Sequence, residues 1–199
     1  MILAMGRVML QSVHMEKPLH EFFSHIARQS FHELGVDDQP VVDYVAALLT
    51  EFARADRLYP IRDRDGRAID HVADITRTPA RISPNDQRSL LRARALRKYV
   101  GDYSLFMSGV FRSHVESRGA LAYYFEEGQR SYWAVSELDL TRFETDFLFF
   151  QQLAKNFEHY SGALDYMRKS YFTPEPGRGP FAEFLRQVEG WISGGLSQN

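Results

Sequence analysis

The sequence contains no cysteine, and this absence excludes several kinds of chemistry together. Without thiols the chain has no disulfide bonds, no thiolate zinc site, no cysteine nucleophile and no thiolate-held iron–sulfur cluster. It also lacks any run of about 18 apolar residues, so no membrane-spanning helix is predicted. Neither sign of charge dominates, because 24 Lys and Arg stand against 26 Asp and Glu among 199 residues. With 44% hydrophobic residues, the chain is long and apolar enough to form a folded core.

Aromatic side chains, in contrast, are abundant, with 15 Phe, 10 Tyr and 2 Trp. Many of the phenylalanines recur at steps of three and four residues, as in Phe143, Phe147, Phe150 and Phe157. This spacing places them on one face of a helix. We therefore interpret most of the phenylalanines as core packing and not as a cofactor site.

The hydrophobic periodicity predicts an all-α, single-domain bundle of six to eight helices. The predicted helices span residues 16–34, 40–56, 70–77, 84–111, 119–137, 141–171 and 181–192. Bends are expected near Gly101 in the fourth helix and near Ser161 and Gly162 in the sixth. Ser83 and Pro84 form a helix-start signal before the fourth helix.

Thr141 and Glu144 have the spacing of a capping box for the sixth helix. Asp65 and Gly66 form a hairpin-turn signal, which predicts one small β-hairpin insertion near residues 58–72. Residues 1–14 are expected to form a weakly ordered extension, residues 15–193 a single helical domain and residues 194–199 a flexible tail.

Small residues share one face in two neighbouring helices. Gly101, Ser104 and Ser108 lie on one face of the fourth helix, while the next helix carries a face formed by Ala120, Tyr124, Gly128 and Tyr132. Small faces let helix backbones approach closely. We therefore expect these two helices to pack tightly at Gly128, with Tyr124 and Tyr132 on either side of the crossing.

The same region carries the patterns GDxxLFxxGxF and YYxxxGxxxY. Their defining residues are Gly101, Asp102, Leu105, Phe106, Gly109, Phe111, Tyr123, Tyr124, Gly128 and Tyr132. The order and spacing resemble an uncharacterised family of helical bacterial proteins, over about 30 residues. That resemblance implies a bacterial origin and an all-α fold, and it implies no biochemical activity.

Asp102 is the acidic residue most worth following, because it adjoins Gly101 in an apolar, aromatic segment. A carboxylate in such surroundings must be paired, or its pKa must shift. A structural hydrogen bond to a tyrosine or an arginine is the favoured interpretation. The alternative is a ligand pocket formed by Asp102, Tyr123, Tyr124 and Glu127.

The predicted helix that begins at Pro84 carries a basic surface formed by Arg88, Arg92, Arg94, Arg97 and Lys98. Residues 116–158 are acidic by comparison, with eight acids and four bases. The near-zero net charge therefore combines one basic and one acidic stretch. The basic surface is one candidate for binding a phosphoanion or a nucleic acid. Arginines that pair with acids on neighbouring helices are the favoured interpretation.

No pattern in the chain indicates a catalytic residue, a metal site or a cofactor. His25 and His32 are about 10 Å apart along a helix axis, too far to share one ion. The HExxH, Glu-x-x-His, P-loop, G-x-S-x-G and dinucleotide motifs are absent from the sequence. Exposed histidines on a polar helix face are the favoured interpretation.

Three functions remain open on this basis. The first is a non-enzymatic interaction or scaffold domain of the bacterial cytoplasm, whose partner is another protein or a second copy of itself. The second is nucleic-acid or phosphoanion binding through the basic helix 84–98, and the third is an enzyme or ligand-binding bundle with a pocket near Asp102. The absence of catalytic motifs and the abundance of amphipathic faces favour the first.

Overall fold

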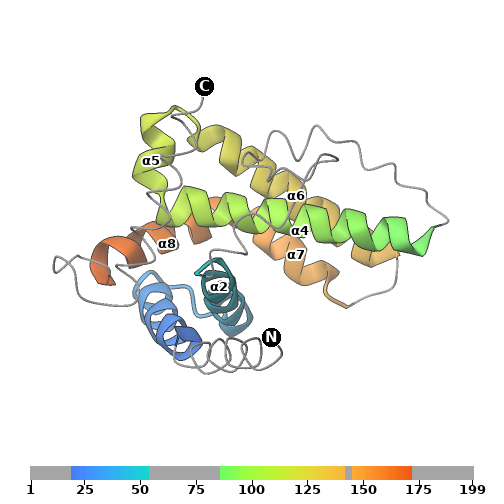
Figure 1. Ribbon diagram of the computed structural model, residues 1–199. Coiled ribbons are helices and arrows are strands. Elements are labelled where there is room, and N and C mark those ends of the chain that lie inside the picture. Colours follow the sequence, from blue (N-terminus) through green and yellow to red (C-terminus); the bar gives the residue numbers. More distant parts are fainter. Residues whose placement is uncertain (1–18, 54–85, 142–144, 172–199) are drawn as a thin grey trace, which may run out of the picture.

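The computed structural model describes residues 19–53, 86–141 and 145–171, which form seven helices and no strand (Figure 1). The first helix covers residues 19–33. The others are α2 (Gln39–Phe52), α4 (Gln87–Val110), α5 (Arg112–Ser117), α6 (Leu121–Thr141), α7 (Phe147–Lys155) and α8 (Phe157–Tyr171). The predicted all-α fold is therefore confirmed for the described residues. The hairpin predicted near residues 58–72 lies outside them, as do the predicted helices 70–77 and 181–192.

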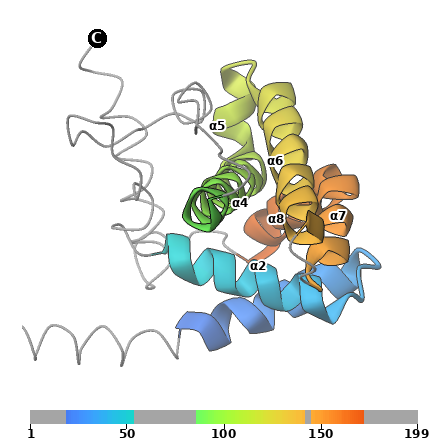
Figure 2. The ribbon, with the colours of Figure 1, turned by 90° about the vertical axis from the view of Figure 1, so that its right-hand side faces the viewer.

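The long helix α4 is the centre of the bundle and packs against α6, α8 and α2. Figure 2 shows the first helix and α2 as a pair that lies across one side of the α4, α6, α7 and α8 group. Glu33 at the end of the first helix joins this pair to α8, since it accepts hydrogen bonds from Tyr166 at 2.9 Å and Tyr171 at 2.7 Å.

The C-terminal half of α4 lies in the core of the molecule, because every residue from Val100 to Val110 is buried. A helix buried on all sides needs neighbours on all sides. Gly101 lets α6 approach α4 closely, and Gly109 does the same for α8. A Cβ atom added at Gly101 would lie 2.7 Å from the Tyr132 ring of α6, and one added at Gly109 would lie 2.5 Å from Leu164 of α8.

The predicted close packing of α4 against α6 is confirmed, but the role expected for Gly128 is wrong. A Cβ atom at Gly128 would lie 2.1 Å from the ring of Phe157, so Gly128 makes room for the start of α8 and not for α4. Tyr124 and Tyr132 do lie against α4. The Tyr132 ring covers Gly101, and the Tyr124 ring centre is 6.4 Å from that of Tyr103.

Local capping signals explain the first two helix ends. The chain turns out of the first helix at Gly35, whose φ of 73° suits glycine, and Val36 donates its backbone N–H back to the Phe31 carbonyl at 2.8 Å. Asp38 then caps α2 by accepting from the Val41 N–H at 3.3 Å, and Pro40 stands in the first turn.

The predicted start of α4 is displaced. The structure places the N-cap at Asp86, whose side chain accepts from the Arg88 N–H at 3.1 Å. Ser83 and Pro84 lie outside the described residues. As predicted, one helix continues through Gly101, since α4 extends to Val110, but the short helix α5 that follows was not predicted. A buried glycine on a packed helix is held by its neighbours, so it need not interrupt the helix.

The predicted helix 141–171 is two helices, and its predicted cap is wrong. Thr141 is the last residue of α6, where its hydroxyl donates to the Leu138 carbonyl at 2.7 Å. The break falls at Asn156, between α7 and α8, and not at Ser161 and Gly162. The Asn156 side chain donates to the Gln152 carbonyl at 3.3 Å, which satisfies a carbonyl at the end of α7.

Candidate functional site

A buried carboxylate, Asp102, lies where α2, α4 and α6 meet, and it is 5% exposed. Tyr44 of α2 and Tyr132 of α6 both donate their hydroxyls to Oδ1, Tyr132 at 2.8 Å. Lys98, one turn earlier on α4, donates its ammonium group to Oδ2 at 2.6 Å. The carboxylate therefore has a cation and two phenols as partners, which offset the cost of burying its charge.

The two phenols act as hydrogen-bond donors. Burial raises the pKa of Tyr44 and of Tyr132 well above the usual value, and the charge of Asp102 raises both further. Lys98 Nζ also lies 4.9 Å from the centre of the Tyr44 ring, in a cation–π contact. Because three donors surround a buried Asp102, the geometry favours the predicted structural role over proton transfer to a substrate.

A second buried carboxylate, Asp139, joins α6 to α4. It is 0% exposed, and the Arg94 guanidinium donates to both of its oxygens, to Oδ2 at 2.8 Å. The same guanidinium lies 5.3 Å from the centre of the Phe150 ring of α7. Arg94 thus holds three helices together through one bidentate ion pair and one ring contact.

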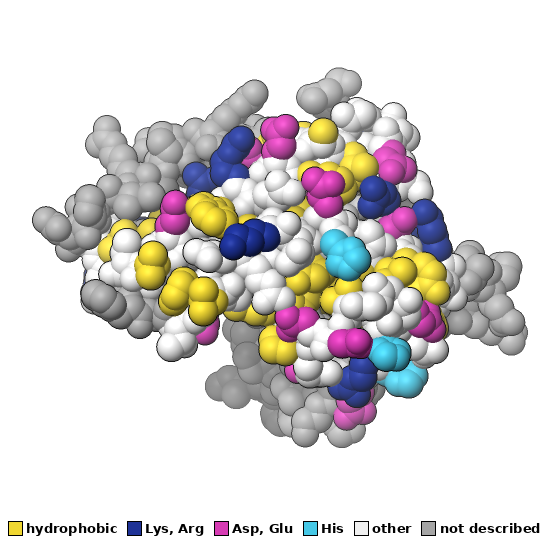
Figure 3. Space-filling view, turned by 180° about the vertical axis from the view of Figure 1, so that it is seen from behind, with side chains coloured by type: hydrophobic (Ala, Val, Ile, Leu, Met, Phe, Trp, Pro, Cys, Tyr) yellow, Lys and Arg dark blue, Asp and Glu magenta, His cyan; other side chains and the backbone are white. Residues whose placement is uncertain are grey.

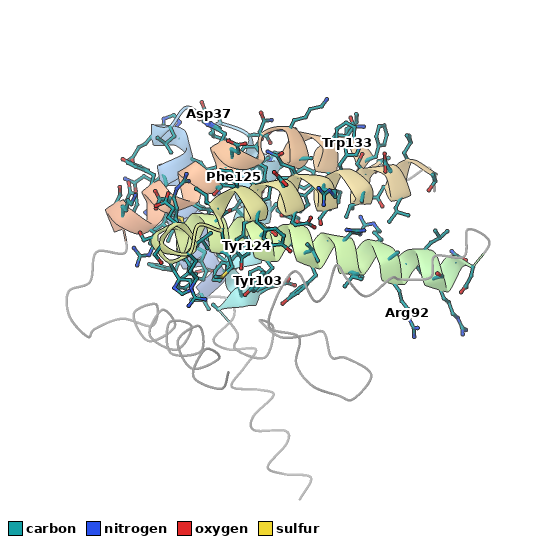
Figure 4. The ribbon with its side chains drawn as sticks, turned by 90° about the horizontal axis from the view of Figure 1, so that it is seen from above. Asp37, Arg92, Tyr103, Tyr124, Phe125 and Trp133 are labelled. Carbon is teal, nitrogen blue, oxygen red and sulfur yellow. The ribbon has the colours of Figure 1, made fainter. Side chains whose placement is uncertain are left out.

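The structure does not bring the four predicted pocket residues into one site. Asp102 is bound by other residues, and Glu127 pairs with Arg130 within α6. Tyr123 is 38% exposed, and its ring centre lies 5.9 Å from that of Tyr124. Figure 4 shows Tyr124 and Tyr103 pointing to the same side of the bundle.

Sequence reasoning missed Tyr44, which is 58 residues away from Asp102 in the chain. Its position on the apolar face of α2 indicated core packing and carried no sign of a carboxylate partner.

The predicted basic surface is smaller than the sequence indicated. Arg94 and Lys98 form ion pairs with the buried Asp139 and Asp102. Of the other three, Arg88 and Arg92 are exposed and Arg97 is half-buried. Figure 4 shows Arg92 pointing away from the helical body.

Two histidines of the first helix have ordinary polar partners. His32 contacts Asp37 at 2.6 Å, and His20 contacts Thr50 at 3.3 Å. Within residues 19–53, 86–141 and 145–171, no group of three or more metal-binding side chains comes together. Asp37 raises the pKa of the exposed His32 imidazole through its hydrogen bond and its charge.

An open groove lies between α6 and α7, with a volume of about 370 Å³. Its walls include Arg130, Trp133, Ala134 and Glu137 of α6 and Ala154 and Lys155 of α7. The Trp133 side chain is 41% exposed, and Lys155 Nζ lies 6.0 Å from the centre of its ring. In Figure 4 Trp133 lies on the side of the bundle opposite to that of Tyr103 and Tyr124. The sequence pattern missed this groove because the position of α7 decides which residues of α6 remain exposed.

The exposed apolar surface continues beyond the groove to Leu140, 52% exposed, and Leu148, 62% exposed. α7 runs back along α6 (Figure 1), and Lys155 of α7 lies against Trp133 of α6. Leu140 is two helical turns after Trp133, and Leu148 is two turns before Lys155, so both leucines lie on the same side as the groove. Figure 3 shows hydrophobic side chains together with basic ones on this side of the molecule. We call this surface the α6–α7 face and define it by Arg130, Trp133, Ala134, Glu137, Leu140, Leu148 and Lys155.

No helix of the described residues combines the length and the hydropathy that crossing a membrane requires. The resemblance of the GDxxLFxxGxF and YYxxxGxxxY segments to a family of bacterial helical proteins stays a prediction. Comparison of the chain with protein-family models, with curated proteins and with solved structures finds no match.

Proposed function

We propose that this chain is a non-enzymatic interaction or scaffold domain, and that the α6–α7 face is its contact surface. The observation that carries the proposal is the exposed Trp133 in an open groove, between Arg130 and Lys155. Tryptophan and arginine are among the residues that most often dominate the binding energy of protein interfaces. Exposed apolar patches with polar rims mark interaction sites in soluble proteins.

The chemistry of the interior supports this proposal over an enzyme. Each of three buried acids, Asp102, Glu127 and Asp139, has a basic partner on α4 or α6. A general base needs a carboxylate oxygen within reach of a substrate proton. The partners of Asp102 occupy both of its oxygens.

Nucleic-acid or phosphoanion binding is the alternative function, and the exposed Arg88 and Arg92 favour it. They are one turn apart on α4, with the exposed Leu91 between them. The ion pairs of Arg94 and Lys98 reduce the positive charge available to a phosphate backbone.

A photo-crosslinking residue at position 133, in the full chain, tests the proposal in extracts of the source cells. Leu91 is the matched control, since it is an apolar helix residue that is 45% exposed. We expect a protein adduct from position 133 and none from position 91. An adduct with nucleic acid at position 91, without a protein adduct at position 133, would establish the alternative instead. The bacterial cytoplasm stays a prediction from the sequence.

A further inference from the structure

We infer that the α6–α7 face binds a second copy of this chain, with the two α6 helices antiparallel across a two-fold axis between Trp133 and Ala134. This inference rests on the proposed function, because it names the partner of the same surface. Two-fold dimers are the commonest oligomers, and their interface uses the same patch on both subunits. Such a patch must therefore be complementary to itself in shape and in charge.

The apolar part of the face satisfies the first condition. A two-fold axis between residues 133 and 134 brings the large Trp133 ring of each copy beside the small Ala134 of the other, in the groove that both residues line. The exposed Leu140 and Leu148 extend the apolar contact away from the axis. A helix of 21 residues such as α6 is about 31 Å long, long enough to form the central part of an interface of ordinary size.

The charged part of the face satisfies the second condition. Arg130 and Glu137 are equally far from the axis in sequence, so the two-fold operation brings Arg130 of each copy opposite Glu137 of the other. Glu137 is exposed and forms no ion pair with the described part of the chain. One guanidinium nitrogen of Arg130 donates a hydrogen bond to Glu127, and the Arg130 side chain remains 63% exposed. It therefore has further N–H groups that can bind a carboxylate.

The same charges disfavour the parallel arrangement of the two α6 helices. In parallel register Arg130 would face Arg130, and Glu137 would face Glu137. Like charges placed opposite each other cost free energy, and opposite charges fix the register. Lys155, which is exposed on α7, adds a positive group at the edge of the same groove.

The first test is the mass of the full chain in solution, measured by sedimentation equilibrium over a range of concentrations. We expect a monomer–dimer equilibrium that reaches about twice 23.1 kDa. Trp133→Ser should raise the dissociation constant by roughly tenfold or more, because the residue lies next to the axis. Leu91→Ser, on α4, should leave the constant unchanged.

A charge exchange tests the orientation of the helices and controls for misfolding. Arg130→Glu and Glu137→Arg should each weaken the homodimer, since each places like charges opposite each other. An equimolar mixture of the two variants should form a heterodimer, because both facing pairs are then of opposite sign. Recovery on mixing cannot come from unfolded chains.

The absence of cysteine allows a direct test of the register. Ala134→Cys should give a covalent dimer on mild oxidation, since a disulfide needs Cα atoms within about 7 Å. Ala122→Cys, on the same side of α6, should give none, because the two introduced thiols would be about 34 Å apart along the axis. Ala95→Cys on α4 is the control for random collisions.

A chain that stays monomeric in all these experiments overturns the inference, as does a dimer that Trp133→Ser and the charge variants leave unchanged. Efficient crosslinking through Ala122→Cys in place of Ala134→Cys would also overturn it. The proposed function fails separately, if position 133 captures neither a second copy nor another protein. A monomer that crosslinks to a different protein through position 133 refutes the dimer and retains the interaction domain.

Discussion

At the scale of single residues, the buried acids stabilise the fold through the cations and hydroxyl groups that they bind. Asp102 binds a cation and two hydroxyls from three helices, with one oxygen serving both phenols. Its removal would leave Lys98 without its anion and both hydroxyls without their acceptor. The loss of one partner from a buried ion pair is more costly than the net value of the pair.

Asp102→Ala is therefore expected to lower the free energy of unfolding by about 3–5 kcal/mol. Urea unfolding followed by circular dichroism measures this change. Asp43→Ala is the control, because Asp43 is an exposed acid on α2, and its change should stay within about 0.5 kcal/mol. Equal effects of the two substitutions would contradict the structural role of Asp102.

His32 provides a prediction for pH. Its hydrogen bond to Asp37 and the charge of Asp37 raise its pKa above the ordinary value of 6.5. The folded chain then holds the proton more tightly than the unfolded chain. The pair therefore stabilises the fold fully below pH 6.5, and this contribution disappears as the pH rises through the folded-state pKa of His32.

An NMR titration of the His32 ring measures that pKa. Asp37→Asn should lower it, and Glu33→Gln should lower it less, because Asp37 is the larger cause of the shift. A larger effect of Glu33→Gln would show that the ring has a different partner in solution.

At the scale of helices, we expect substitutions at two glycines to change the free energy of unfolding in opposite directions. Gly128 of α6 lies against the ring of Phe157, whereas a Cβ atom at Gly162 of α8 would have no atom within 4 Å. Gly128→Leu should lower the free energy of unfolding by roughly 1–3 kcal/mol through overpacking.

Gly162→Ala is the matched substitution in open space. It should raise the free energy of unfolding by about 0.5–1 kcal/mol, because alanine loses less conformational freedom in a helix. Thermal unfolding of both variants measures the two effects. A Gly128→Leu variant that is as stable as the original chain would contradict the close contact of α8 at Gly128, and a destabilised Gly162→Ala variant would contradict the open space at Gly162.

Periodicity located the helices but not all of their ends. It predicted one helix over 141–171 because the apolar spacing continues across Asn156, yet the structure divides it there. A break of one residue leaves the apolar pattern nearly in phase, so it has little effect on the sequence signal. Phe157 of α8 packs against Gly128 of α6, and the apolar spacing within residues 141–171 carries no information about that contact.

At the scale of the whole molecule, the predicted basic and acidic stretches partly neutralise each other. Arg94 of the basic stretch pairs with Asp139 of the acidic one, 45 residues later. Three basic residues of the predicted surface remain for a phosphate backbone, namely Arg88, Arg92 and Arg97.

We therefore expect the chain to bind duplex DNA no more tightly than non-specifically, with a dissociation constant of about 10⁻⁴–10⁻⁶ M at physiological salt. Fluorescence anisotropy over a series of salt concentrations measures this affinity. The triple variant Arg88→Ser, Arg92→Ser and Arg97→Ser should bind DNA more weakly, and its affinity should depend less steeply on the salt concentration. Tighter binding that the triple variant abolishes would favour the nucleic-acid function.

The sequence by itself determined the all-α class, most of the helix positions in the described residues, the buried aromatic packing and the absence of thiol chemistry. These properties follow from composition and from local spacing, which act within a few turns of helix. The tertiary structure alone decided that Tyr44 and Tyr132 bind Asp102, that Arg94 and Lys98 are ion-paired, and that Trp133 remains exposed. Each of these depends on which helices meet across long separations in the chain. Spacing within one helix shows which face is apolar, but the neighbour that covers this face is fixed only when the bundle packs.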